Sequence, residues 1–145
     1  MTHLYDQLDD ILQREYDLCV QLIELLKREK DVITRLNANE LEQLLREKEM
    51  LTFKIKRCDE QRDKLLSEMG LENKTLKEVA LSAEGEYRNK MLALAEEFTI
   101  VIQTIRDLNK INSMLIAKSL HYIKTSYNFL TTFNINPKEK LSVEA

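Results

Sequence analysis

The sequence predicts an all-α fold, a helical bundle or coiled coil made of an antiparallel helical hairpin and a long third helix. Gly and Pro are rare, with two and one in 145 residues, so few positions favour turns. Charged residues make up 32% of the chain, a composition typical of coiled coils and bundles. Apolar residues recur every three or four positions over long stretches, the period of an amphipathic helix. We expect one helical domain over residues 1–133 and a flexible tail over 134–145.

The first two predicted helices, over residues 4–36 and 40–69, form the hairpin. The first carries an apolar stripe: Leu8, Leu12, Cys19, Leu22, Leu26, Ile33 and Leu36. The second carries another: Leu41, Leu44, Leu51, Ile55, Cys58, Leu65 and Met69. Asn39 is the predicted N-cap of the second helix, with Glu42 completing a capping box. Gly70 is expected to end this helix.

The two stripes mirror each other about the AsnAlaAsn segment at 37–39. Residues whose numbers add up to 77 therefore face each other, which fixes the register of the hairpin. This rule pairs Glu29 with Lys48 and Glu15 with Arg62, so that the two facing residues have opposite charges in both pairs. We expect both pairs at the edge of the seam with their charged ends in water. There each pair stabilises by about 0–1 kcal/mol and disfavours a slipped register.

The same rule places Cys19 opposite Cys58 and Leu22 opposite Ile55. Facing helix axes lie about 8–10 Å apart, whereas the Cα atoms of a disulfide usually lie within about 7 Å, so we expect two reduced cysteines in a small core layer. Two cysteines are too few for a zinc site. Neither histidine has a Glu three residues before it, as a di-iron bundle requires. We expect no metal, no cofactor and no enzymatic activity.

The rest of the chain predicts a short helix over 76–82, capped by Thr75 and Glu78, and a long helix over 86–133. The long helix has an a/d stripe: Phe98, Val101, Ile105, Leu108, Leu115, Tyr122, Phe129 and Phe133. A second stripe lies beside it: Ile102, Ile116, Ile123 and Leu130. One seam serves one neighbouring helix, so two seams require two neighbours. Asn112 and Ser119 interrupt the first stripe at heptad spacing, and we expect them to fix its register.

The long helix exceeds its partners in length. At 1.5 Å per residue each arm of the hairpin spans about 45–50 Å, and the long helix about 70 Å. The extra length lies beyond about Lys118, and so apolar a surface must be covered. This part of the helix must therefore kink back, self-associate or bind another protein's helix. We expect the surface for another protein's helix to consist of six residues, about half of them core: Leu115, Ile116, Leu120, Ile123, Tyr127 and Leu130.

Charge and polarity exclude several function classes. The formal net charge of -3 gives no basic field for nucleic acid. The N-terminus has neither a basic nor an apolar region of a signal peptide. Polar residues interrupt the segment 111–130, so we expect no membrane insertion; among them are Asn112, Ser113, Lys118, Ser119, His121, Lys124 and Asn128. The near absence of basic residues around the apolar stripe weakens a lipid-surface function. We expect a cytoplasmic protein.

The order of motifs over about residues 8–123 is similar to that of the FlgN-type flagellar export chaperones. In the hairpin the resemblance rests on LeuLeuLysArgGlu at 25–29 and AspGluGlnArgAspLysLeuLeu at 59–66, before Gly70. In the long helix it rests on a pattern Asn-x-x-Asn-x-x-Leu-Ile-x-x-Ser-Leu, matched by Asn109, Asn112, Leu115, Ile116, Ser119 and Leu120.

This resemblance implies a chaperone that binds the C-terminal amphipathic helices of hook-filament junction proteins and keeps them soluble and unassembled before export. It also implies the flagellar export gate as a partner. Family members often end in a Tyr-Gly segment associated with the gate, and this chain has no Gly after Gly85. A homodimer in the absence of cargo fits the residues as well. The alternative is a structural homodimeric coiled-coil or scaffold protein, which covers the same apolar surface with a second copy.

Overall fold

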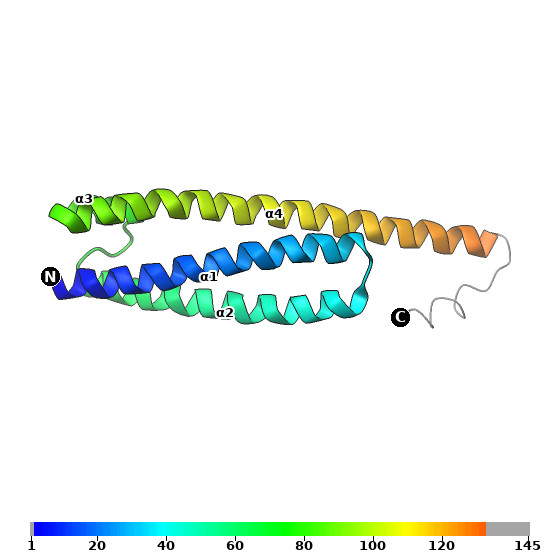
Figure 1. The fold of residues 1–145 in the computed structure, drawn as a ribbon, viewed down its shortest axis with the longest axis horizontal. Coiled ribbons are helices and arrows are strands. Elements are labelled where there is room, and N and C mark those ends of the chain that lie inside the picture. Colours follow the sequence, from blue (N-terminus) through cyan, green and yellow to red (C-terminus); the bar gives the residue numbers. More distant parts are fainter. Residues whose placement is uncertain (1, 133–145) are drawn as a thin grey trace.

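The computed structural model describes residues 2–132, which form four α-helices and no strand (Figure 1). The helices are α1 (Thr2–Thr34), α2 (Ala38–Glu68), α3 (Leu76–Ser82) and α4 (Gly85–Thr132). The all-α prediction is confirmed, and each predicted helix lies within two residues of its observed bounds. The predicted tail over 134–145, together with Phe133, lies outside the described residues.

α1 is the central helix of the bundle (Figure 1). α2 runs antiparallel to α1 along one of its sides, and α4 runs parallel to α1 along another side. The short helix α3 packs against the N-terminal end of α4. Tyr87 Oη donates to Asp6 Oδ1 at 2.6 Å and Lys90 Nζ to Asp9 Oδ2 at 3.2 Å, both across 81 positions, as two parallel helices in constant register require. No Cα atom of α2 lies within 8 Å of one of α4, so α1 separates them.

The apolar core is concentrated at the end of the bundle where α3 lies. Side chains from all four helices meet there, among them Leu8, Leu12, Leu65, Val79, Met91 and Phe98. A smaller cluster joins α1 and α2 nearer their connecting turn: Leu25, Val32 and Leu44. The C-terminal part of α4 therefore lies away from the main core.

The turn between α1 and α2 differs from the prediction at its cap. Asn37, not Asn39, is the N-cap of α2, and its Oδ1 accepts a hydrogen bond from Glu40 N at 3.1 Å. Leu36 adopts a φ of 56°, and its N–H donates to Ile33 O at 3.1 Å. This left-handed residue reverses the chain early, so α2 begins one residue after Asn37 and Asn39 lies within its first turn.

The other two caps follow the prediction. Gly70 has a φ of 73° and ends α2, while Leu71 N donates to Leu66 O at 2.8 Å, the pattern of a Schellman motif. Thr75 Oγ1 accepts from Glu78 N at 3.2 Å and begins α3. These short-range signals are readable from sequence because they involve only neighbouring residues.

Candidate functional site

α4 is longer than the helices beside it and extends past the turn between α1 and α2 (Figure 1). It has 48 residues against 33 in α1, which corresponds to about 72 Å against about 50 Å. The two helices start near the same end of the bundle, so the surplus lies at the C-terminal end of α4. α4 is a single helix to Thr132, so the described residues do not kink back onto the hairpin.

The level at which α1 stops follows from the contacts of Asn112. Its side chain bonds to two residues of α1 that lie 86 and 83 positions earlier. This offset places the end of α1, Thr34, level with the residues around Lys118. Residues 119–132 therefore lie beyond the hairpin, over about 20 Å, and we call them the overhang.

The six residues predicted to bind another helix lie in the overhang or directly before it, and none is buried. Leu115 and Leu130 are half-buried. The exposed fractions of the other four are 62% for Leu120, 46% for Ile123, 39% for Tyr127 and 38% for Ile116. The expectation that about half of the set is core is wrong, because the main core lies at the opposite end. Tyr122, which belongs to the a/d stripe of the long helix, is also 65% exposed. The overhang has no other helix of the described chain beside it to cover this side chain.

A buried polar network ties α4 to both helices of the hairpin directly before the overhang. The Glu29 carboxylate is 2% exposed, and its two oxygens accept from Asn112 Nδ2 at 2.8 Å and from Lys48 Nζ at 3.5 Å. Asn112 Nδ2 also donates to Leu26 O at 3.0 Å, while Asn112 Oδ1 has no partner among the described residues. The Glu29–Lys48 pair is thus present, but the expected exposure of its carboxylate is wrong, because α4 covers that side of α1.

The second pair, Glu15 with Arg62, is also present. Arg62 Nη1 donates to both carboxylate oxygens of Glu15 at 2.8 Å, and Arg62 Nη2 lies 3.1 Å from Asp59 Oδ1. Glu15 is only 5% exposed, so its expected position in water is wrong too. Burial raises the pKa of Glu15 to about 8; Asp59 adds to the rise, and Arg62 opposes it.

The remaining register residues vary in their burial. Ser119 is half-buried and Asn109 is exposed, so Asn112 is the member of the long-helix motif that enters the core. Cys19 and Cys58 are both buried and carry free thiols. Burial raises the pKa of the Cys19 thiol to about 11, which keeps it protonated and unreactive at neutral pH.

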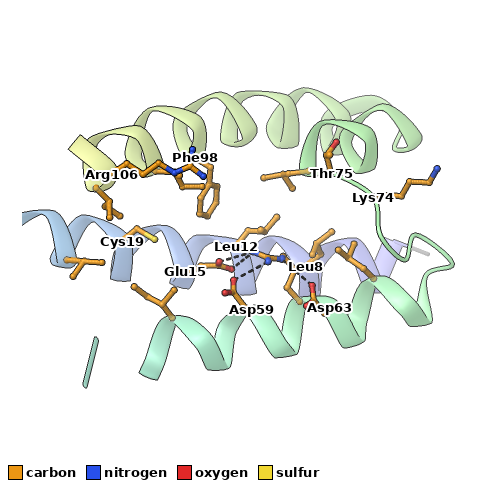
Figure 2. A pocket seen from close by; sticks show the side chains of 17 residues that line it. Leu8, Leu12, Glu15, Cys19, Asp59, Asp63, Lys74, Thr75, Phe98 and Arg106 are labelled. Carbon is orange, nitrogen blue, oxygen red and sulfur yellow. Dashed lines mark hydrogen bonds and ion pairs between the residues drawn. The ribbon is translucent and has the colours of Figure 1, made fainter. Parts of the chain in front are cut away.

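A groove of about 580 Å³ lies between α2 and α4, with α1 as its floor (Figure 2). Leu12, Glu15 and Cys19 lie on the floor, and Phe98 and Arg106 project from α4. Leu22 and Ile55, which we expected to face each other, line the groove together. Sequence reasoning missed this groove, because the period of each helix does not say how far apart α2 and α4 lie.

A family model described as FlgN protein matches residues 1–134. The chain belongs to the FlgN protein family. This is a family of flagellar export chaperones, so the chain has a general chaperone role in flagellar export, with flagellar substrate proteins as the class of partner. A search of curated proteins and a search of solved structures each found no match.

The match covers the hairpin, the long-helix motif and the overhang together. Within residues 2–132, no group of three or more His, Cys, Asp or Glu side chains is placed to hold a metal ion. No helix in that same part of this FlgN-family chain is long and apolar enough to cross a membrane. The most extensive chemical feature of the site is therefore its exposed apolar surface.

Proposed function

We propose that this FlgN-family protein binds the C-terminal amphipathic helices of hook-filament junction proteins in the cytoplasm and keeps them soluble and unassembled before export. The observation that carries this proposal is the overhang, where α4 presents apolar side chains with no helix of residues 2–118 beside them. Contiguous exposed apolar surface of this kind marks interaction sites. An amphipathic helix covers such a surface with its own apolar face.

The spacing of the exposed residues fits a helical partner. Ile116, Leu120, Ile123, Tyr127 and Leu130 follow one another at steps of four, three, four and three residues, so they lie along one side of α4. Lys118 and Lys124 are the only residues with a formal charge from 111 to 132. The surface therefore favours a partner whose apolar stripe is flanked by acidic rather than basic residues.

Two further partners belong to the same proposal. In the absence of cargo, the overhangs of two copies cover each other in a homodimer, since the same apolar surface is then available on both. The flagellar export gate is a second partner on the strength of family membership alone. The Tyr-Gly segment that family members often have near the C-terminus is not matched here, since this chain has no Gly after Gly85. Residues after Thr132 lie outside the described residues.

The double substitution Ile123→Ala with Leu130→Ala tests the surface. Each buried Leu or Ile contributes about 1.5–3 kcal/mol, so the loss of both weakens binding of a junction-protein C-terminal segment about a hundredfold or more. The thermal midpoint of the free protein changes little, because the overhang lies beyond the hairpin. Met50→Ala with Phe53→Ala is the matched control, since both residues are 62% exposed on α2. A large fall in midpoint with unchanged affinity would show that the overhang is core.

Sedimentation velocity separates the chaperone from the structural alternative. We expect the purified protein to form a mixed complex when the junction-protein segment is added, with any homodimer dissociating as the segment binds. A homodimer that persists unchanged at saturating segment would favour the structural coiled-coil protein. The measurement uses the full chain and needs no substitution.

A further inference from the structure

We infer that the helix bound at the overhang continues into the groove between α2 and α4 and packs there as a fourth helix beside α1, α2 and α4. This inference rests on the proposed function, because it extends the footprint of the same partner. It assigns a second contact surface, the groove, whose walls are α2 and α4 and whose floor is α1 (Figure 2). The occupant is one amphipathic helix of the exported partner.

One stripe of α4 serves both surfaces. Ile102 lines the groove and is 41% exposed. Ile116, Ile123 and Leu130 follow at multiples of seven residues, so they lie on the same side of α4 as it passes from the groove to the overhang. Within this stripe, Asn109 is the polar interruption. A helix that packs along this side of α4 over the overhang is therefore directed into the groove.

The two outer helices, α2 and α4, leave space between them for another helix. No Cα atom of α2 comes within 8 Å of one of α4, so the two leave an opening over α1. A helix packs against its neighbours at axis distances of about 8–10 Å and fits into an opening of this kind. The lining is largely apolar on all three sides, with Leu22 on α1, Ile55 on α2, and Phe98 and Ile102 on α4. Figure 2 shows one of them, Phe98, pointing from α4 toward α1.

Charged side chains on the two walls of the groove also favour a helical partner. Arg106 projects into the groove from α4 and has no ion pair or hydrogen bond with any residue of the described part of the chain. On the opposite wall the Asp63 side chain is 74% exposed and lies 3.9 Å from Arg62 Nε. The groove thus favours a helix with an acidic residue toward α4 and a basic residue toward α2. A second copy of the overhang lacks the acidic residue, since residues 119–132 contain no Asp or Glu.

The two surfaces together set the length of the bound helix. From Ile102 to Leu130 the stripe covers 28 positions, or about 42 Å of helix. A partner segment of about 28 residues reaches both ends, whereas one of about 14 residues covers only the overhang. The inference therefore predicts that affinity rises when a junction-protein segment is lengthened beyond the overhang.

Calorimetric titration of the full chain with junction-protein C-terminal segments tests the inference. We expect Ile102→Ala and Arg106→Glu each to weaken a segment of about 28 residues by roughly threefold to tenfold, with the loss from Arg106→Glu disappearing at high salt. Lys54→Glu is the matched charge reversal, because Lys54 lines the opposite face of the hairpin beside Gln21 and Cys58. It leaves the affinity unchanged.

The outcomes separate the two proposals. If Ile102→Ala and Arg106→Glu bind like the wild-type chain while Ile123→Ala with Leu130→Ala binds weakly, the partner is confined to the overhang and only this inference is overturned. If neither set changes the affinity, or the wild-type chain does not bind, the proposed function fails as well. A wild-type homodimer that becomes monomeric in Ile102→Ala would assign the groove to a second copy and overturn the inference.

Discussion

The substitution Asn112→Asp tests whether the buried network holds α4 on the hairpin. Asn112 Nδ2 donates to a carboxylate oxygen of Glu29 at 2.8 Å, and both side chains are 2% exposed. Asp has nearly the shape of Asn, so the substitution changes the chemistry of the contact and little else. At neutral pH it replaces the donor with a second carboxylate, which faces the first at a site that water does not reach.

The size of the loss follows from the ways in which the protein can respond. Two unit charges at this separation repel by about 6 kcal/mol at an effective dielectric constant of 20. One carboxyl will instead take up a proton, which restores the hydrogen bond to Glu29, whereas the hydrogen bond to Leu26 O stays lost and costs about 1 kcal/mol more. Holding an Asp protonated costs about 1.4 kcal/mol for each pH unit above its usual pKa near 3.9, so about 5 kcal/mol at pH 7.5 and about 1.5 kcal/mol at pH 5. Protonation costs less than the repulsion between two charged carboxylates, so the folded variant protonates one carboxyl.

We therefore expect Asn112→Asp to lower the free energy of unfolding by about 5–6 kcal/mol at pH 7.5 and by about 2–3 kcal/mol at pH 5. The sign follows because the shared proton is bound more tightly in the folded state, so stability is lost as pH rises. Urea unfolding followed by circular dichroism at several pH values measures it. Asn109→Asp, on the exposed side of α4, is the control and changes stability by less than about 0.5 kcal/mol. A small, pH-independent loss in Asn112→Asp would refute the network.

Three further predictions concern the caps and the second carboxylate. Leu36→Gly raises the free energy of unfolding by about 0.5–1 kcal/mol in urea titrations, because Leu36 has a φ of 56° and is 53% exposed; an unchanged or lower value would refute this. Gly70→Ala lowers the thermal midpoint, by an amount equivalent to about 1 kcal/mol, because Gly70 has a φ of 73°; an unchanged midpoint would contradict it. The wild-type free energy of unfolding falls between about pH 5 and pH 8, because burial raises the pKa of Glu15 from 4.5 to about 8 and an acid with a raised folded pKa loses stability as pH rises. Glu15→Gln removes this decline, and an equally steep decline in the variant would assign it to other groups.

The hairpin was predictable because its information is local and repeated. Two apolar stripes and two pairs of oppositely charged residues indicate the same register, and both ion pairs, Glu15–Arg62 and Glu29–Lys48, form as that register predicts. The length of α4 followed equally from its helical apolar period, which continues past the polar residues Asn112 and Ser119. Because the helices of the hairpin are shorter than α4, the part of α4 beyond about Lys118 extends past them.

The burial of the two carboxylates was not predictable in the same way. Whether Glu29 meets water depends on which side of α1 the third helix covers, and the periodicity of one helix does not contain that information. The groove depends on the distance between α2 and α4, which is also a property of three helices together. The cap at Asn37 was missed because it requires a Leu in the left-handed region, which L-residues rarely adopt.

Hydrogen exchange along α4 tests the central claim, that the overhang is the surface on which the chaperone binds its substrate. Amides of residues 119–132 should exchange rapidly in the free protein, because these residues pack against no other helix of residues 2–118. Adding a saturating junction-protein C-terminal segment should slow exchange in 119–132 more than in any other part of the described chain. Protection confined to α1 and α2, with no change beyond Lys118, would contradict the account.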